Sequence, residues 1–303
     1  MTEAELSDIP LDDLVHELGR RVGEEENADI YLYFGDIDDE GFRQLHSKSR
    51  EGRHSRAILI LTTNGGDASV AYRIARQFHQ RYERFTIYVP NYCRSAGTIL
   101  ALGAHDLIMN SDALLGPIDP QLRKRDEICT TESALSSRAT LNALGEMAYG
   151  VFEPMVVNLI TKSEAGLSFE LSSQVCADFT SRLMSGLVSK LDPTVFGRHK
   201  RAIDTAIEYG KRLAEVSGNA PQEAVEQLAT AYPDCRFAID FAEAAKLFRN
   251  VSEPSELLRM FAAAEQIEDD VDPHEQAADE SYDGAQSDDE EDQPAEDQGP
   301  TYH

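Results

Sequence analysis

The sequence lacks any apolar run close to the roughly 18 residues that a membrane-spanning helix requires. It also opens without the charged and then apolar leader that is typical of a secretory signal. We therefore expect a cytoplasmic protein that makes no membrane contact.

Cysteine is scarce as well. Cys93, Cys129, Cys176 and Cys235 lie far apart and match neither a zinc-ligand spacing nor a CxxC pair. This pattern predicts reduced thiols and no metal site.

Positive charge is the third shortage, with 28 Lys and Arg against 55 Asp and Glu and a net charge of -27. From Glu265 to the end there are about 16 acidic residues and no basic ones, which leaves roughly -11 for the rest. A body this acidic argues against a nucleic-acid partner, because affinity for phosphates rests on Lys and Arg. The small basic clusters at 123–125 and 198–201 are typical of solvated surfaces.

What the chain does contain is a repeated pattern of short apolar runs. The segments AILILTT (57–63) and FTIYV (85–89) are continuous apolar runs, and residues 70–78 between them keep helical spacing. Strands that are apolar on both faces indicate a parallel sheet with right-handed crossovers. Further strands are expected at 29–34 and 106–109, so the fold class is α/β, built from βαβ units.

The remaining segments predict four parts in chain order. An amphipathic helix lies in an N-terminal segment, 1–24, and the α/β core occupies 25–130. A helical extension with expected breaks at Pro154 and Pro193 occupies 131–262, and its last part adds a short strand and a helix. Residues 263–303 cannot bury enough apolar area to offset chain entropy, which predicts a disordered acidic tail.

Two strand ends carry the candidate site. Thr63-Asn-Gly-Gly-Asp67 follows one strand and Asn91-Tyr-Cys-Arg-Ser-Ala-Gly97 follows the next. In an open α/β sheet both lie at the carboxyl edge, where ligands bind. Glycines at Gly65 and Gly66 let backbone N–H groups point at an incoming oxygen, and together with the amide of Ala96 they outline an oxyanion hole beside Ser95. Taken singly, Ser95 is also a plain helix cap and the glycine pair a plain turn.

The same residues resemble a known family. TNGGD, the amphipathic helix after it, and VPNYCRSAGTILALGAHDLIMNSDALLGPIDPQ are similar to the serine dehydrogenase proteinase group of the Clp/crotonase-like superfamily, which is related to Clp-type peptidases and signal peptide peptidase A. The close match covers about residues 57–121, and a looser one extends to about 248. The resemblance implies a Clp/crotonase-like core, a serine protease or related hydrolase with Ser95 as nucleophile, and oxyanion donors at Gly65 and Gly66.

The general base stays open at this point. No histidine lies about 25 residues after Ser95, where Clp-type peptidases have one, and His105 lies roughly 15 Å along a helix, which indicates a structural role. Where signal peptide peptidase A relatives carry a lysine, this chain has Arg138, which does not lose its proton. The candidates for the base or an orienting group are Asp119, Lys124 and Lys162.

Two other functions use the same fold. One is acyl-coenzyme A chemistry of the crotonase type, which does not need the serine, and the other is a non-catalytic oligomeric scaffold. The peptidase hypothesis requires no cofactor, takes a peptide or protein as substrate, and leaves room for a regulatory protein partner. The resemblance also implies a homo-oligomer.

Overall fold

The centre of the fold is a five-stranded parallel sheet with the strand order β1-β2-β3-β5-β9. The computed structural model describes residues 11–123, 131–162, 166–234 and 236–270. The strands are β1 (Asp29–Phe34), β2 (Arg56–Thr62), β3 (Arg84–Val89), β5 (Asp106–Met109) and β9 (Val251–Ser252). The predicted α/β class and parallel sheet are therefore confirmed.

Alternate side chains of the central strands enter two separate cores. Leu59 in β2 lies opposite Tyr31 and Ile87 in the register, and all three point into the larger core. Ile58 and Tyr88, one position away, point into the smaller core on the other face. Both faces of β2 and β3 are thus covered, which explains the unbroken apolar runs in the sequence.

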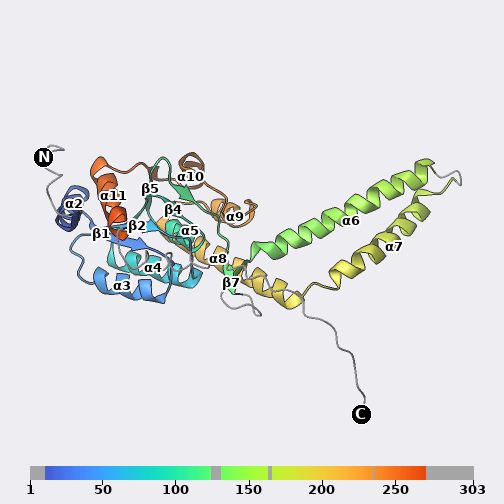
Figure 1. Ribbon diagram of the computed structural model, residues 1–303, viewed down its shortest axis with the longest axis horizontal. Helices are drawn as coiled ribbons and strands as arrows, with labels where there is room; N and C mark the ends of the chain where they lie inside the picture. The colour runs from blue at the N-terminus through green and yellow to red at the C-terminus, as the bar shows by residue number, and fades with distance from the viewer. Residues whose placement is uncertain (1–10, 124–130, 163–165, 235, 271–303) are drawn as a thin grey trace, which may run out of the picture.

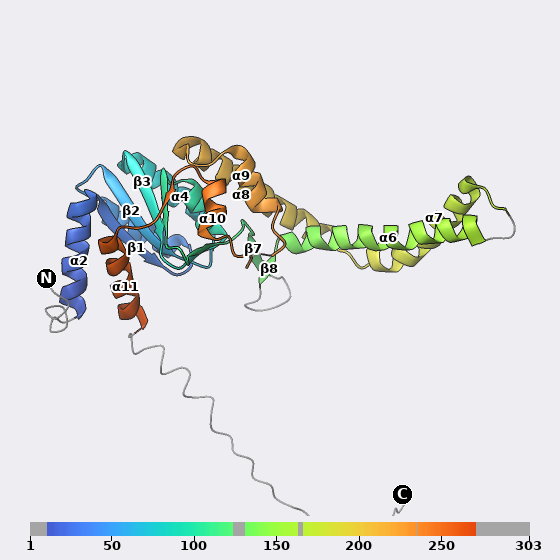
Figure 2. The ribbon, with the colours of Figure 1, turned by 90° about the horizontal axis from the view of Figure 1, so that it is seen from above.

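Helices cover each face of the sheet. The larger core is closed by α3 (Asp39–Ser49), α4 (Ala68–Arg81), α5 (Ala96–Leu102) and α8 (Pro193–Ser217). The smaller one is closed by α2 (Leu11–Glu26) and α11 (Glu256–Asp270), which lie side by side in Figure 2. The N-terminal helix therefore packs on the body of its own chain.

Two small sheets lie at the carboxyl edge of the main sheet. The strands β4 (Tyr92–Cys93) and β6 (Leu114–Leu115) pair in parallel, and β7 (Gln121–Arg123) pairs antiparallel with β8 (Thr131–Ser133). The segment between β6 and β7 contains Asp119. Because β4 leads directly to Ser95, these pairings bring the two candidate residues to one place.

A long helical hairpin projects from the body. It consists of α6 (Leu135–Lys162) and α7 (Phe169–Val188), and α8 returns the chain to the core (Figure 1). The helix α9 (Gln222–Thr230) packs on α8, and α10 (Phe241–Leu247) lies against β9.

Two segments differ from the sequence-based expectations. Pro154 lies inside α6, so the predicted break there is wrong: packing of α6 along α7 outweighs the one hydrogen bond that proline removes. The helix α11 continues to Asp270, past the boundary at 263 expected for the tail, because its apolar face packs on α2. Residues 271–303 lie outside the described residues, so the rest of the tail stays a prediction.

Candidate active site

The loop after β2 is fixed by its own hydrogen bonds. Thr63 Oγ1 accepts from the Gly65 amide at 3.0 Å and lies 3.1 Å from the Gly65 carbonyl oxygen, to which it donates. Ile37 pairs with Gly66 in a β-bridge, in which the Ile37 amide donates to the Gly65 carbonyl at 2.7 Å. Gly65 and Gly66 have φ values of +126° and +138°. Residues other than glycine rarely adopt this backbone conformation.

Ser95 has an unusual backbone. Its φ is +49° and its ψ is -108°, a conformation that costs a residue with a side chain on the order of 1–3 kcal/mol. Although Ser95 stands at the N-cap position of α5, its side chain makes no cap hydrogen bond. Its Oγ instead donates to the backbone carbonyl of Asp119 at 2.8 Å, and the residue is 7% exposed. Simple helix capping therefore does not explain this serine.

The glycine loop and Ser95 are in direct contact. The Thr63 amide donates to the Tyr92 carbonyl at 3.1 Å, and the Arg94 amide donates to the Thr63 carbonyl at 3.0 Å. A Cβ placed on Gly65 would lie 3.0 Å from Ser95 Cβ and 3.6 Å from the Ala96 amide nitrogen. The two loops that the sequence predicted to meet at the sheet edge do meet.

The three predicted oxyanion donors are not equivalent. The Gly65 amide already donates to Thr63 Oγ1, so in this conformation it is not available to a ligand. In the part of the chain that the structure describes, the amides of Gly66 and Ala96 have no acceptor. The role of all three amides as oxyanion donors stays a prediction.

Asp119 lies next to Ser95 and is fully buried. Its backbone carbonyl accepts from Ser95, while its carboxylate accepts from the Leu135 amide at the start of α6 at 3.3 Å. Burial raises the pKa of the Asp119 carboxyl above its usual range, and hydrogen bonds from Ser133 and Leu135 oppose that rise. The carboxylate is therefore engaged at the start of α6, and its role as a base or orienting group stays a prediction.

The two lysine candidates are not brought to Ser95. Lys162 is exposed at the far end of α6, and a helix of 28 residues places it about 40 Å from Leu135 (Figure 1). Within one chain it cannot reach Ser95, because the distant tip of the hairpin carries it away from the sheet edge. Lys124 lies outside the described residues. His105, expected to be structural, accepts from the Phe85 amide through Nδ1 at 3.0 Å and stacks on His79.

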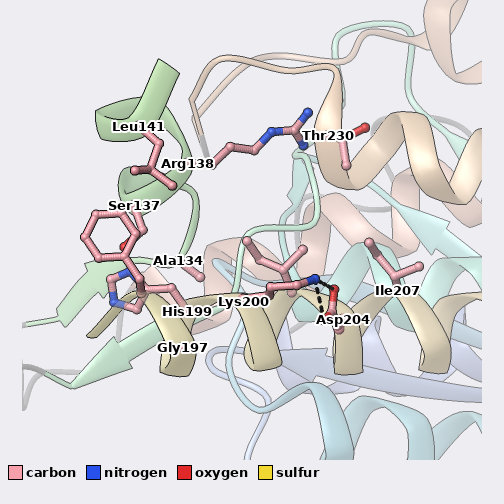
Figure 3. Close-up of a pocket in the computed structure, with 12 residues that line it drawn as sticks. Ala134, Ser137, Arg138, Leu141, Gly197, His199, Lys200, Asp204, Ile207 and Thr230 are labelled. Carbon is pink, nitrogen blue, oxygen red and sulfur yellow. Dashed lines mark hydrogen bonds and ion pairs between the residues drawn. The ribbon is translucent and has the colours of Figure 1, made fainter. Parts of the chain in front are cut away.

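A buried serine–histidine pair escaped the sequence analysis. His199 Nδ1 lies 2.6 Å from Ser137 Oγ, and His199 is 2% exposed. Both residues line a cavity of about 490 Å³ between the start of α6 and α8 (Figure 3). The sequence placed His199 in a solvated basic cluster. Its spacing of seven residues from buried Ala206 would have indicated that it shares the inner face of α8.

Some kinds of site are absent from the described residues. Within residues 11–123, 131–162, 166–234 and 236–270, no three His, Cys, Asp or Glu side chains are grouped to hold a metal ion. In the same ranges, no helix combines the length and the apolar character needed to cross a membrane.

Comparison with known proteins supports the interpretation of the core. Residues 29–134 match the family described as ClpP-like SDH-type serine proteinases. Two uncharacterized proteins of Methanocaldococcus jannaschii are 38% and 42% identical to this chain over 64 residues, which is 21% of this chain and 22% of each relative. The resemblance predicted from the sequence is thus confirmed for residues 29–134, and the matched segment is about a fifth of each curated relative.

Solved structures also resemble the chain. A mutant of the 1510-N membrane-bound stomatin-specific protease is 16% identical, covers 74% of this chain and 78% of its own, and has a TM-score of 0.43. Another mutant of that protease, in complex with a substrate peptide, is 17% identical, covers 76% of each chain and has a TM-score of 0.43. ClpP1 from Listeria monocytogenes is 11% identical, covers 56% of this chain and 84% of its own, and has a TM-score of 0.28.

Proposed function

We propose that the chain is a serine peptidase in which Ser95 is the nucleophile. The observation that carries the proposal is the positive φ of Ser95, between the short strand β4 and helix α5. Nucleophilic serines of α/β hydrolases occupy strained turns of this kind, because the turn presents the hydroxyl at the edge of the sheet. The family match over residues 29–134 supports the same reaction class.

In the proposed reaction, Ser95 Oγ leaves the Asp119 carbonyl and attacks the carbonyl carbon of a peptide bond. The C–N bond breaks in the following step, and the proton from Ser95 goes to the leaving amine by way of a base. Negative charge that develops on the substrate oxygen is stabilised by the amides of Gly66 and Ala96. Each such donor is typically worth about 2.7–4 kcal/mol in the transition state.

The base remains a prediction with the three original candidates. Burial favours the neutral form of Asp119 and moves its pKa toward the range useful to a general base. Lys124 is in the segment that follows β7. Lys162, at the tip of the hairpin, would serve only a neighbouring subunit.

Assembly into a homo-oligomer through the α6–α7 hairpin is part of the proposal. Over its 28 residues, the charged side chains of α6 are Arg138, Glu146, Glu153 and Lys162. Many large apolar side chains of the hairpin are exposed: Met147, Tyr149, Val157, Phe169, Val175, Phe179, Leu183 and Val188. Exposed large apolar side chains gathered on one projecting hairpin are typical of a protein interface. A second copy of the chain presents a matching surface, as expected for an isologous contact.

A non-catalytic scaffold is the second candidate. The hydrogen bond from Ser95 Oγ to a backbone carbonyl favours it, because a carbonyl oxygen does not remove a proton at neutral pH. Nothing in the described residues favours the acyl-coenzyme A alternative over either of these.

Hydrolysis of an unfolded protein substrate separates the two candidates. We expect the wild type to cut unfolded casein, with the new ends identified by mass spectrometry, and Ser95→Ala to lose at least 1,000-fold in rate. Ser185→Ala, an exposed serine on α7, is the matched control and should cut at the wild-type rate. A Ser95→Ala variant that retains the wild-type rate would exclude the proposed nucleophile.

A further inference from the structure

The cavity between α6 and α8 has the composition of a ligand pocket. Its volume of about 490 Å³ lies within the roughly 300–1,000 Å³ that is usual for small-molecule sites. The walls are largely apolar and include Leu141, Phe196, Ile203 and Ile207. Such a lining favours an aromatic or large aliphatic group.

The polar groups of this cavity differ in their pairing. Lys200 Nζ lies 2.9 Å from Asp204 Oδ2, so these two charges largely neutralise each other. Arg138 makes no ion pair with any residue that the structure describes, and its guanidinium extends across the cavity toward Thr230 in Figure 3. An unpaired guanidinium beside apolar walls selects a ligand that joins an apolar group to an anion. Carboxylates and phosphates both match its fork of donors, and a carboxylate is the anion that a peptide chain carries at its end.

The cavity adjoins the Ser95 site through two short links. Ala134, which lines the cavity, donates its amide to the Pro120 carbonyl at 3.0 Å. The next amide, of Leu135, donates to the carboxylate of Asp119, whose carbonyl accepts from Ser95. A peptide bound in the cavity therefore needs only a few residues to extend from there to Ser95.

From these observations we propose that the cavity between α6 and α8 binds the C-terminal residue of a peptide. The apolar side chain enters between Leu141 and Ile207, and the terminal carboxylate pairs with Arg138. The inference rests on the proposed peptidase function for its choice of a peptide, and it names the substrate class: chains with a free carboxylate and an apolar last residue. Cleavage at Ser95 then removes a short C-terminal fragment.

The chain has no tryptophan, so a peptide that ends in tryptophan is a direct fluorescent probe. The full chain with Ser95→Ala is used throughout, so that the probe is not consumed. We expect acetyl-Ala-Ala-Trp with a free carboxylate to bind with a blue-shifted emission, and its C-terminal amide to bind about tenfold more weakly.

Two variants separate the carboxylate contact from the apolar contact. Arg138→Gln should bring the acid down to the affinity of the amide, whereas Arg182→Gln, an equal charge change on exposed α7, should leave it unchanged. Leu141→Ala, at a position that is 52% exposed, should weaken acid and amide alike. Circular dichroism checks that each variant is folded.

The outcomes distinguish this inference from the proposed function. Equal affinity for acid and amide, or no change on Arg138→Gln, would overturn the inference even if Ser95 hydrolyses casein. Binding of the acid with the expected discrimination, in a protein whose Ser95 proves inert, would support the site and reject the peptidase. Displacement of the peptide by decanoate at a lower concentration than by acetyl-tryptophan would overturn the choice of a peptide.

Discussion

Gly66→Ala tests whether the glycine loop is as tightly constrained as the structure indicates. At a φ of +138°, a methyl group on Gly66 overlaps the backbone carbonyl of Ile37 and lies 2.7 Å from the Ile37 amide nitrogen. Both are main-chain atoms, so no side-chain rotation relieves the overlap. The loop must move away from Ile37 and lose the two hydrogen bonds of 2.7 and 2.8 Å that flank the bridge.

The magnitude follows from these two effects. The backbone conformation costs alanine about 1–3 kcal/mol, and each lost hydrogen bond costs about 0.5–1.5 kcal/mol. The sum is on the order of 2–6 kcal/mol, a large part of the roughly 5–15 kcal/mol by which a domain is stable.

Urea unfolding followed by circular dichroism measures the change. Gly145→Ala is the matched control: it lies within α6, nothing lies within 4 Å of its added Cβ, and we expect a gain of about 0.5–1 kcal/mol. If Gly66→Ala unfolds within about 1 kcal/mol of the wild type, the loop is not held by Ile37 and the close approach of Gly66 to Ile37 is wrong.

Two further changes test the buried carboxylate and the hairpin. Burial raises the pKa of Asp119 in the folded state, so the folded state binds the carboxyl proton more tightly than the unfolded state does. Tighter proton binding stabilises the fold at low pH, and this stabilisation is lost as pH rises from about 4 through the raised pKa. The free energy of unfolding of Asp119→Asn relative to wild type should therefore increase from pH 4 to pH 7 in urea titrations; a difference that decreases would contradict the direction of the shift. Phe179→Asp on the hairpin should lower the mass of the assembly in light scattering, whereas Val216→Asp, at an exposed apolar residue on α8, should not. Unchanged mass in the first variant would remove the hairpin from the interface.

The sheet and the loop pair were predictable because their signals are local. Residues 57–61 and 85–89 are buried on both faces, and no amphipathic alternative competes with a continuous apolar strand. Each strand is followed at once by its loop, so the topology of one βαβ unit suffices to bring Gly65 to Ser95.

The features that the sequence did not predict depend on tertiary contacts. The sequence predicts a helix break at Pro154, yet α6 continues through this residue because α7 packs alongside. The sequence predicts that His199 belongs to a basic surface, yet it is buried against Ser137, which lies 62 residues earlier in the chain. The Gly65 amide is engaged by Thr63 Oγ1, a geometric detail that residue identities alone do not fix.

Labelling by a fluorophosphonate tests the central claim most directly, because the reagent reports an activated serine without any knowledge of the substrate. The purified wild type should gain one label per chain in intact mass, peptide mapping should place the label on Ser95, and Ser95→Ala should gain none. A folded wild type that stays unlabelled, or a label on any residue other than Ser95, would contradict the assignment of Ser95 as the nucleophile.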